Sequence, residues 1–278
     1  MTREFLKMHG LGNDFVVIDA RSTPYLPAEA EVRAIADRKT GVGCDQFIVV
    51  EPSEAAGARG FMRIRNADGG EVSACGNAAR CVGWLLMEEA GSDRVTFETA
   101  AGLLEAYRAD NGRITVDMGP ARLDWAQIPL AAPADTLRVE AVDHAGFAGP
   151  VAVSVGNPHA VFFVDDAEAV PLTDVGPVLE HHPAFPERTN VEFAQILSPT
   201  AIRMRVWERG VGITRACGTG ACATLVAAAR RGLTGRKADV VLDGGTLTIE
   251  WTDDNRILMT GPVALSFNGR LAPELVAE

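Results

Sequence analysis

The stretch ACGNAARC at residues 74–81 has a near copy far along the chain, ACGTGACA at residues 216–223. Both begin with Ala-Cys-Gly, and both are followed by apolar residues at helical spacing until a glycine, Gly91 in the first copy and Gly232 in the second. A glycine in that place is typical of the C-terminal end of a helix. Each copy therefore predicts a largely buried helix with a cysteine just before its first turn.

The two halves of the sequence agree well beyond these stretches. Cys75 and Cys217 are 142 positions apart, and further pairs agree at the same offset: Met62 with Met204, Arg63 with Arg205, Gly70 with Gly212, Gly119 with Gly261 and Pro120 with Pro262. Closer to the N-terminus the offset is 144, which pairs Asn13 with Asn157 and Gln46 with Asn190. Solenoid repeats have periods of roughly 20–50 residues. A repeat of this length predicts a duplicated domain instead.

Short runs rich in branched and aromatic residues predict strands in both halves. They cover residues 15–19, 46–51, 61–65, 95–99, 103–107 and 113–118, and then 151–155, 160–164, 190–196, 202–207, 239–242, 246–251 and 256–259. Neither half shows a regular alternation of strands and helices. We therefore expect an α+β fold of two pseudo-symmetric duplicated domains, each a mainly antiparallel twisted sheet wrapped around one long central helix.

The repeat also predicts where the domains begin and end. A chain of 278 residues is long enough for two domains of ordinary size. We expect residues 1–120 to form the first and residues 121–262 the second, with residues 121–150 as the connection between the halves. The tail, residues 263–278, lies outside the repeat, and its strand-like start predicts that it completes the first domain.

Composition excludes several classes of protein. A net charge of −11 and a pI near 5.0, without a basic stripe, argue against a nucleic-acid partner. No apolar run approaches the roughly 18 residues of a membrane span, and the N-terminus lacks a signal core. We therefore expect a cytoplasmic protein. The five cysteines are an odd number in a chain that can bury a real core, which favours free thiols over a disulfide framework.

A cysteine at a helix N-terminus has a distinct chemistry. The unpaired N–H groups and the helix dipole lower the pKa of a thiol there, and they also bind carboxylates. Two such helix ends facing each other would hold a carboxylated carbon between Cys75 and Cys217. One thiolate would then remove a proton from one face, and the other thiol would deliver a proton to the opposite face. This arrangement predicts inversion of an α-carbon.

No dinucleotide-binding or phosphate-binding loop pattern is present, so we expect neither a cofactor nor a catalytic metal. Stabilisation of the carbanion would then depend on the helix ends and on a pocket that excludes water. Compact polar residues near glycines or strand ends are suited to holding the polar atoms of an amino acid, although each alone could serve a turn. They are Asn13, Gln46, Asn66, Asn77, Asn157 and Asn190.

Six motifs, taken in order along the chain, resemble those of the diaminopimelate epimerases, which are pyridoxal-independent enzymes of lysine and peptidoglycan precursor synthesis. They are KMHGLGNDF (7–15), GVGCDQ (41–46), RNADGGEVSACGNAARC (65–81), GNPHAV (156–161), TNVEF (189–193) and ERGVGITRACGTGACA (208–223). The resemblance extends from the N-terminus to Pro262. It implies cofactor-independent interconversion of LL- and meso-diaminopimelate by two-base proton transfer, in an enzyme that forms a homodimer.

The resemblance also implies roles for particular residues. Cys75 and Cys217 would be the two acid–base residues, and His159 and Glu208 would adjust the thiol pKa values. The substrate would be contacted by Asn13, Gln46, Asn66, Gly76, Asn77, Asn157, Asn190, Glu208, Arg209, Gly218 and Thr219. Arg209 is a suitable partner for a carboxylate and Glu208 for an ammonium group. The chain departs from the family pattern at Ala78, where glycine is common, and at Ile213, where glutamate is common.

Two alternatives remain. A proline or hydroxyproline racemase would use the same pair of thiols, although the many polar positions favour a substrate with two polar ends. The spacing C-x5-C and C-x4-C could instead indicate a structural zinc site, but it differs from the usual C-x2-C pattern. We expect Cys81 and Cys222 to be small core residues and Cys44 to be a bystander in a glycine-rich turn.

Overall fold

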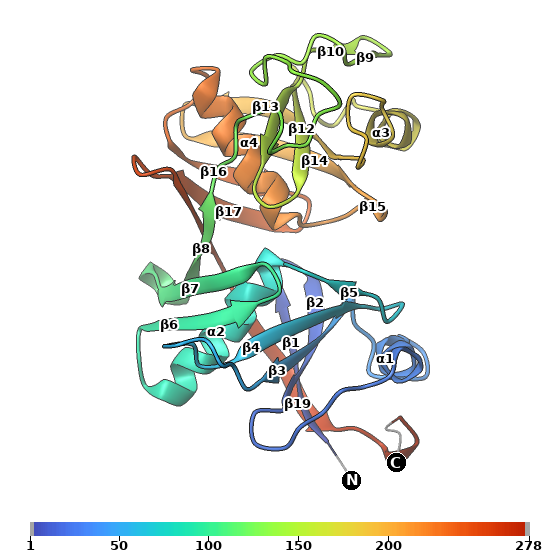
Figure 1. The fold of residues 1–278 in the computed structure, drawn as a ribbon, viewed down its shortest axis with the longest axis vertical. Coiled ribbons are helices and arrows are strands. Elements are labelled where there is room, and N and C mark those ends of the chain that lie inside the picture. Colours follow the sequence, from blue (N-terminus) through green and yellow to red (C-terminus); the bar gives the residue numbers. More distant parts are fainter. Residues whose placement is uncertain (1–2, 276–278) are drawn as a thin grey trace. The chain divides into compact units, whose positions relative to one another are not determined.

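The computed structural model describes residues 3–275. The chain forms two compact units (Figure 1). Unit 1 contains the described residues up to Val116 together with those from Thr260 onward, and unit 2 runs from Asp117 to Met259. Strands β8 (Ile114–Pro120) and β18 (Arg256–Gly261) each contain one of these boundaries.

Unit 1 is built on a mixed sheet. Its strands are β1 (Glu4–Gly10), β2 (Asn13–Asp19), β3 (Gln46–Glu51), β4 (Phe61–Asn66), β5 (Glu71–Val72), β6 (Arg94–Thr99), β7 (Gly102–Arg108) and β19 (Ala264–Arg270). Strand β1 pairs antiparallel with β2 and β19, β3 with β4, β4 with β5, and β6 with β7, whereas the pairs β2–β3 and β4–β6 are parallel. The strand in the C-terminal tail is thus part of the unit 1 sheet.

Unit 2 repeats this pattern of pairing. Its strands are β11 (Val151–Ser154), β12 (Pro158–Phe163), β13 (Asn190–Ser198), β14 (Ala201–Glu208), β15 (Gly212–Ile213), β16 (Lys237–Leu242) and β17 (Gly245–Trp251), with a small hairpin of β9 (Asp143–His144) and β10 (Phe147–Ala148). The pairs β11–β12, β13–β14, β14–β15 and β16–β17 are antiparallel, and β12–β13 and β14–β16 are parallel. Every strand predicted from the sequence overlaps one of these elements.

The two long helices begin at the quoted stretches. Helix α2 (Gly76–Ala90) packs against β1, β6 and β7, and helix α4 (Gly218–Arg230) packs against the strands of unit 2 (Figure 1). Each helix has a cysteine at its N-cap, and α2 ends at Gly91, whose φ of 59° lies in the left-handed region. Ten residues of each helix are buried, which is why both sequences are apolar on almost every side.

The parallel pairs require crossover connections. Helix α1 (Glu29–Ala36) lies between β2 and β3 in the chain, and α2 lies between β4 and β6; α3 (Leu172–Glu180) and α4 have the corresponding places in unit 2. The sequence did not indicate α3, because Gly176 and Pro177 interrupt its helical pattern. Gly176 is needed there, since a Cβ would lie 2.6 Å from the Trp207 ring. The described residues also form two short 3-10 turns, η1 (Asp110–Gly112) and η2 (Pro273–Leu275).

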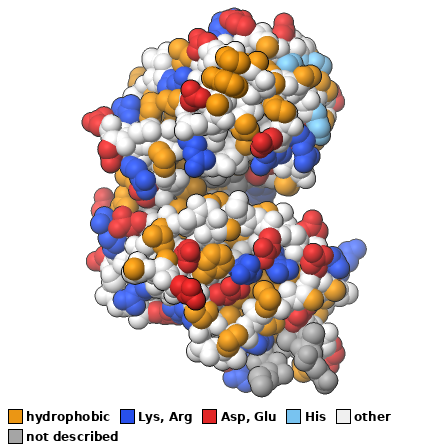
Figure 2. Space-filling model, viewed as in Figure 1, with side chains coloured by type: hydrophobic (Ala, Val, Ile, Leu, Met, Phe, Trp, Pro, Cys, Tyr) orange, Lys and Arg blue, Asp and Glu red, His pale blue; other side chains and the backbone are white. Residues whose placement is uncertain are grey.

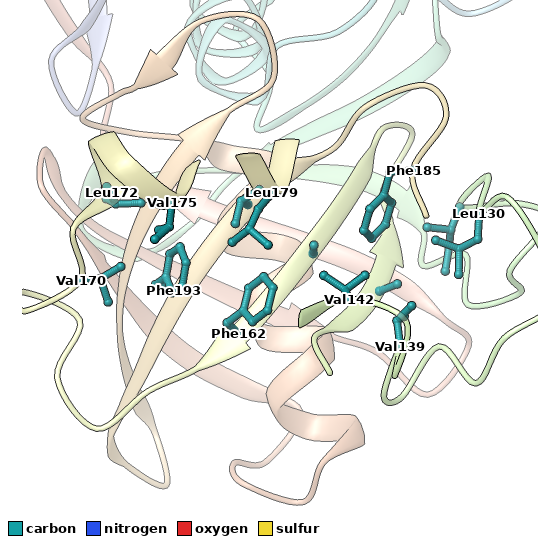
Figure 3. Packing of buried hydrophobic residues seen from close by; sticks show 14 residues of the cluster. Leu130, Val139, Val142, Phe162, Val170, Leu172, Val175, Leu179, Phe185 and Phe193 are labelled. Carbon is teal, nitrogen blue, oxygen red and sulfur yellow. The ribbon is translucent and has the colours of Figure 1, made fainter. Parts of the chain in front are cut away.

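A hydrophobic core of unit 2 lies between α3 and the sheet. Figure 3 shows Leu172, Val175 and Leu179 of α3 beside Phe162 and Phe193, whose rings stack with centroids 5.3 Å apart. The segment 121–150, expected to be a plain connection, adds four fully or largely buried residues to this cluster: Ile128, Leu130, Val139 and Val142. Their apolar side chains make the segment part of the unit 2 core.

The surface is of mixed charge. Lys and Arg side chains are interspersed with Asp and Glu side chains over the visible face of each unit (Figure 2). Within residues 3–275, none of the helices has both the length and the apolar character needed to cross a membrane.

Candidate active site

The first half-site lies at the N-terminus of α2. Cys75 is the N-cap residue and is half-buried, and its Sγ lies 3.9 Å from Asn13 Oδ1. Asn77 Nδ2 donates a hydrogen bond to the same oxygen at 3.2 Å. Gly76 and Asn77 are the first residues of α2, and N–H groups in the first turn of a helix point away from the carbonyl groups of that helix. The thiol therefore lies beside the donors that would bind a carboxylate.

A buried arginine within α2 holds the side chain of Asn77 in place. Arg80, one turn after Asn77, is completely buried and donates to Asn77 Oδ1 at 2.8 Å. This contact fixes the amide of Asn77 with its NH2 group toward Asn13. The sequence analysis did not single out Arg80, so it missed this role.

Asn13 is held from the other side by a network of charges. Asp45 Oδ2 accepts from Asn13 Nδ2 at 2.9 Å, and Arg38 donates to both Asp45 and Asp14 at 2.6 Å. Burial opposes ionisation of Asp14, but hydrogen bonds from Arg38 and Lys7 outweigh it and hold the pKa of that carboxyl well below its usual range. The network leaves Asn13 Oδ1 facing α2.

Gln46 and Asn66 form the remaining part of this half-site. They are paired across β3 and β4, and Gln46 Nε2 donates to Asn66 Oδ1 at 3.0 Å. Gln46 Oε1 is buried and accepts no hydrogen bond within residues 3–275. An unpaired buried carbonyl is costly. It is therefore a suitable acceptor for a donor on a bound molecule.

The second half-site lies at the N-terminus of α4. Cys217 is the N-cap residue and is only 4% exposed. Its Sγ accepts a hydrogen bond from Gly220 N at 3.3 Å and lies 3.6 Å from Thr219 Oγ1. Gly218 and Thr219 begin the helix, in the same way that Gly76 and Asn77 begin α2.

Burial dominates the chemistry of the second thiol. It raises the pKa of the Cys217 thiol well above its usual range, and the carboxylates of Glu208 and Glu192 raise that pKa further. Hydrogen bonds from Thr219 and Gly220 act in the opposite direction but are weaker. The prediction of a lowered thiol pKa is therefore wrong for Cys217, because loss of water around the thiolate outweighs the favourable helix end.

Asn157 and His159 connect this thiol to the sheet. Asn157 Nδ2 donates to Thr219 Oγ1 at 3.4 Å, and Asn157 Oδ1 lies 3.0 Å from His159 Nε2. The other ring nitrogen, His159 Nδ1, lies 2.6 Å from Glu192 Oε1, and both side chains are completely buried. Glu192 is a further residue that sequence reasoning missed.

Asn190, Glu208 and Arg209 lie around the end of β14. Asn190 Nδ2 donates to Pro158 O at 2.9 Å, and Asn190 Oδ1 accepts from Arg209 N at 3.0 Å. Thr214 donates to Glu208. Burial raises the pKa of the Glu208 carboxyl, and hydrogen bonds from Thr214 and Cys217 offset part of that increase. The Arg209 guanidinium donates to Glu187 O at 3.0 Å.

The other cysteines are placed as core residues. Cys44, Cys81 and Cys222 are buried, and burial raises the pKa of Cys44 to about 11 and that of Cys81 to about 12. Among residues 3–275, no group of three or more potential ligands is arranged to hold a metal ion. The two departures from the family motifs differ in place: Ala78 is completely buried in α2, whereas Ile213 in β15 is 43% exposed.

Known proteins of the same fold include two solved structures that match almost the whole chain. A predicted epimerase from Pseudomonas aeruginosa is 20% identical with a TM-score of 0.69, covering 97% of this chain and 99% of that one. A hydroxyproline epimerase from Agrobacterium vitis, with bound trans-4-hydroxy-L-proline, is 18% identical with a TM-score of 0.68, covering 98% and 93%. At these identities the likeness shows the fold alone.

Sequence relatives are much more similar. A diaminopimelate epimerase from Rhodospirillum centenum is 62% identical over 99% of this chain and 94% of the relative, and one from Phenylobacterium zucineum is 58% identical over 98% of each. The family model for diaminopimelate epimerase matches residues 5–123 and 151–266, which include both half-sites. The chain belongs to the diaminopimelate epimerase family.

Proposed function

We propose that this protein is a cofactor-independent epimerase that interconverts LL- and meso-diaminopimelate. The observation that carries the proposal is the cysteine at the N-cap of a buried helix in each unit, Cys75 at α2 and Cys217 at α4, in a chain 62% identical to a diaminopimelate epimerase. This chemistry belongs to lysine and peptidoglycan precursor synthesis.

The proposed architecture is a duplication. The two units repeat the same order of antiparallel and parallel strand pairs, and each long helix lies against the sheet of its own unit. We therefore propose that each unit is a twisted sheet wrapped around one central helix, descended from one ancestral domain. As domain boundaries we propose residues 1–120 with the tail 263–278, and residues 121–262.

The proposed mechanism is proton transfer on both faces of the α-carbon, which requires both thiols. One cysteine, as the thiolate, takes the α-proton and becomes a thiol, leaving the electron pair on carbon. The other cysteine gives its proton to the opposite face and becomes the thiolate. The protein ends the turnover with the two roles exchanged, so one proton must pass to and from solvent before the next turnover in the same direction.

The carbanion needs stabilisation that bulk water does not supply. N–H groups at the start of α2 and α4 are fixed donors that require no reorganisation during the reaction. We propose that they bind the carboxylate of the reacting amino acid, and that delocalisation into this carboxylate receives the developing charge. Burial of Cys217 keeps its resting form the neutral thiol, ready to donate.

The remaining polar groups are proposed to hold the substrate. Gln46 Oε1, buried without a partner in the described part of the chain, is suited to accept from an ammonium group. Asn13, Asn66, Asn77, Asn157, Asn190, Glu208, Arg209, Gly218 and Thr219 are proposed as further contacts, and His159 with Glu208 as groups that adjust the thiols. A homodimeric assembly is proposed from the family resemblance, and a place in the cytoplasm from the sequence composition.

The test is a panel of substrates followed by chiral chromatography. LL-diaminopimelate, L-proline and trans-4-hydroxy-L-proline are each incubated with the reduced protein, and the stereoisomers are quantified over time. We expect conversion of LL-diaminopimelate to the meso isomer and no change in the other two. Inversion of proline or hydroxyproline without inversion of diaminopimelate would overturn the proposed substrate and favour the racemase alternative.

A further inference from the structure

The two half-sites differ at two buried positions that lie in matching places of the two sheets. In unit 2, His159 on β12 and Glu192 on β13 form a completely buried pair with 2.6 Å between Nδ1 and Oε1. At the repeat offset of 144 residues, the corresponding positions in unit 1 are Phe15 on β2 and Ile48 on β3, both completely buried. The fold therefore accepts an apolar pair here, and unit 2 carries an ionisable pair instead.

An ionisable pair at such a buried position destabilises the fold unless its polar atoms have hydrogen-bond partners. Burying a carboxyl group away from water is costly, and most costly where the group is left without a partner. Glu192 Oε2 is buried and has no hydrogen-bond partner in the described residues, so the contact with His159 is what compensates the burial of this carboxyl group. A cost of this kind, at a position where apolar residues fit, indicates a functional role.

The contacts of His159 define which nitrogen carries a proton. Nε2 faces Asn157 Oδ1 at 3.0 Å, and an amide oxygen can only accept. Nε2 must therefore donate, and the hydrogen bond between Nδ1 and Glu192 Oε1 needs a second proton, so His159 and Glu192 together carry two protons. Without the negative charge of Glu192 the buried ring would hold a single proton, which could lie on Nδ1; the lone pair on Nε2 would then face the lone pairs of the amide oxygen.

The proton on Nε2 decides how Asn157 is oriented. With Oδ1 toward His159, the NH2 group of Asn157 points to Thr219 Oγ1 at the start of α4. In unit 1 the amide of Asn13 has the opposite orientation: its NH2 group donates to Asp45, and its oxygen faces Asn77 and Cys75 at the start of α2. The two helix ends thus meet a hydrogen-bond acceptor in unit 1 and a donor in unit 2.

We propose that Glu192 is a positioning residue of the second half-site: by stabilising the second proton of the pair, it keeps Nε2 of His159 protonated and so orients Asn157 with its NH2 group toward Thr219, whose hydroxyl lies beside Cys217. The catalytic consequence rests on the proposed epimerase function, whereas the proton on Nε2 does not. The other ionisable groups beside this pair are Glu208 on β14 and Cys217. Gly220 leaves room for the carboxylate, since a Cβ there would lie 2.9 Å from Glu192 Oε1.

The first arm of the test does not depend on activity. Long-range proton–nitrogen correlation spectra of 15N-labelled protein report which ring nitrogens of a histidine carry protons, and loss of one set of signals in His159→Phe assigns that ring among the five histidines. We expect Nε2 of His159 to be protonated in the wild-type protein and in Glu192→Gln, whose amide can donate to Nδ1. An Nε2 nitrogen with the shift of a lone-pair-bearing imidazole nitrogen in the wild-type protein would overturn the proposal.

The second arm is a double-mutant cycle that transplants the unit 1 pair into unit 2. We expect His159→Phe and Glu192→Ile each to lower kcat/KM for LL-diaminopimelate by about 10- to 100-fold, as displaced positioning groups commonly do. Because Glu192 acts through His159, the double variant should be no less active than His159→Phe. It should also be more stable than either single variant, since neither buried group is then left unpaired.

Glu192→Gln provides the conservative control. It should retain kcat/KM well above that of Glu192→Ile, because the tautomer is preserved; if Glu192→Ile does not fold, Glu192→Gln and the double variant still decide the case. A further loss in the double variant equal to that of Glu192→Ile alone would show that Glu192 acts independently of His159 and would overturn the proposal. A wild-type protein that leaves diaminopimelate unchanged would refute the epimerase function, while the spectra would still test the proton on Nε2.

Discussion

Replacing Gly220 with alanine tests whether the second half-site is shaped around a carboxylate. Gly220 is in the first turn of α4, and an added Cβ would lie 2.9 Å from Glu192 Oε1, 3.2 Å from Cys217 Sγ and 3.3 Å from Cys217 Cβ. Glu192 cannot move freely, because its Oε1 is already 2.6 Å from His159 Nδ1 in a completely buried pair. The substitution should therefore both strain the helix end and loosen the pair.

The size of the effect follows from three contributions. Inserting a methyl group into a closely packed site costs about 1–3 kcal/mol. Loss of the charge-assisted hydrogen bond costs about 1.5–3 kcal/mol more. The better helix propensity of alanine offsets about 1 kcal/mol. We expect Gly220→Ala to lower the free energy of unfolding by about 1.5–5 kcal/mol.

The assay is urea unfolding followed by circular dichroism, together with kcat/KM for LL-diaminopimelate. The matched control is Ala78→Gly, because position 78 corresponds to position 220 at the 142-residue offset and Ala78 is completely buried in α2. That change should cost only about 1–2 kcal/mol, from helix propensity and the lost methyl group. A Gly220→Ala protein that is about 1 kcal/mol more stable and fully active would refute the reasoning.

Three further substitutions test other parts of the structure. Glu208→Gln removes a carboxylate that raises the pKa of the Cys217 thiol, so the thiolate should form at lower pH. In the reaction direction that uses the Cys217 thiolate as the base, the rising limb of kcat/KM against pH should therefore move to lower pH, and a limb that stays in place would contradict this. Gly83→Ala places a Cβ 2.6 Å from the Ala106 Cβ, which is fixed to the backbone and cannot rotate away. The clash, partly offset by the better helix propensity of alanine, should lower the free energy of unfolding by up to about 2 kcal/mol, and a variant more stable in denaturant would be inconsistent with this packing. Asp14 has a lowered pKa in the folded protein, so its contribution to stability is present above the pKa of the unfolded chain, about 3.9, and is lost as pH falls toward the folded pKa. Asp14→Asn should therefore lose less stability than the wild-type protein below about pH 4, and an equal acid dependence of the two proteins would argue against the charge network.

Local patterns predicted most of the elements that hold the site. The helices after Cys75 and Cys217 were predicted because their apolar residues recur at helical spacing and end at glycine. Helix α3 was missed because tertiary packing, including the close approach of Gly176 to Trp207, overrides a poor helical pattern. Strand β1 was not predicted either, because a charged residue, Lys7, lies at its centre. In the folded structure Lys7 is buried and paired with Asp14, and the sequence alone does not show this pairing.

Some residues of the candidate site could be predicted from the sequence and others could not. Motif residues next to the cysteines were predicted, because they lie within a few positions of the helix starts. Glu192 was missed because its partner His159 is 33 positions away, and only the parallel pairing of β12 and β13 brings them together. A signal did exist in the sequence: at the 144-residue offset, Phe15 and Ile48 are both replaced by ionisable residues.

The lowered pKa expected for both thiols failed for Cys217 because a helix end is only one of several influences on a thiol. Sequence shows the helix end but gives neither the degree of burial nor the nearby carboxylates. Cys217 is 4% exposed and lies beside Glu208 and Glu192, and these two features raise its pKa.

The measurement that tests the central claim most directly is the position of deuterium at early times of reaction in D2O. Each isomer is used in turn as substrate, and proton NMR and mass spectrometry measure the label in the product and in the remaining substrate, with Cys75→Ala and Cys217→Ala as controls. If two thiols serve the two faces of the carbon, the product acquires deuterium at the inverted carbon in both directions while the remaining substrate stays largely unlabelled, and each substitution abolishes inversion. Return of the original proton into the product, or continued inversion by either variant, would contradict a two-thiol epimerase.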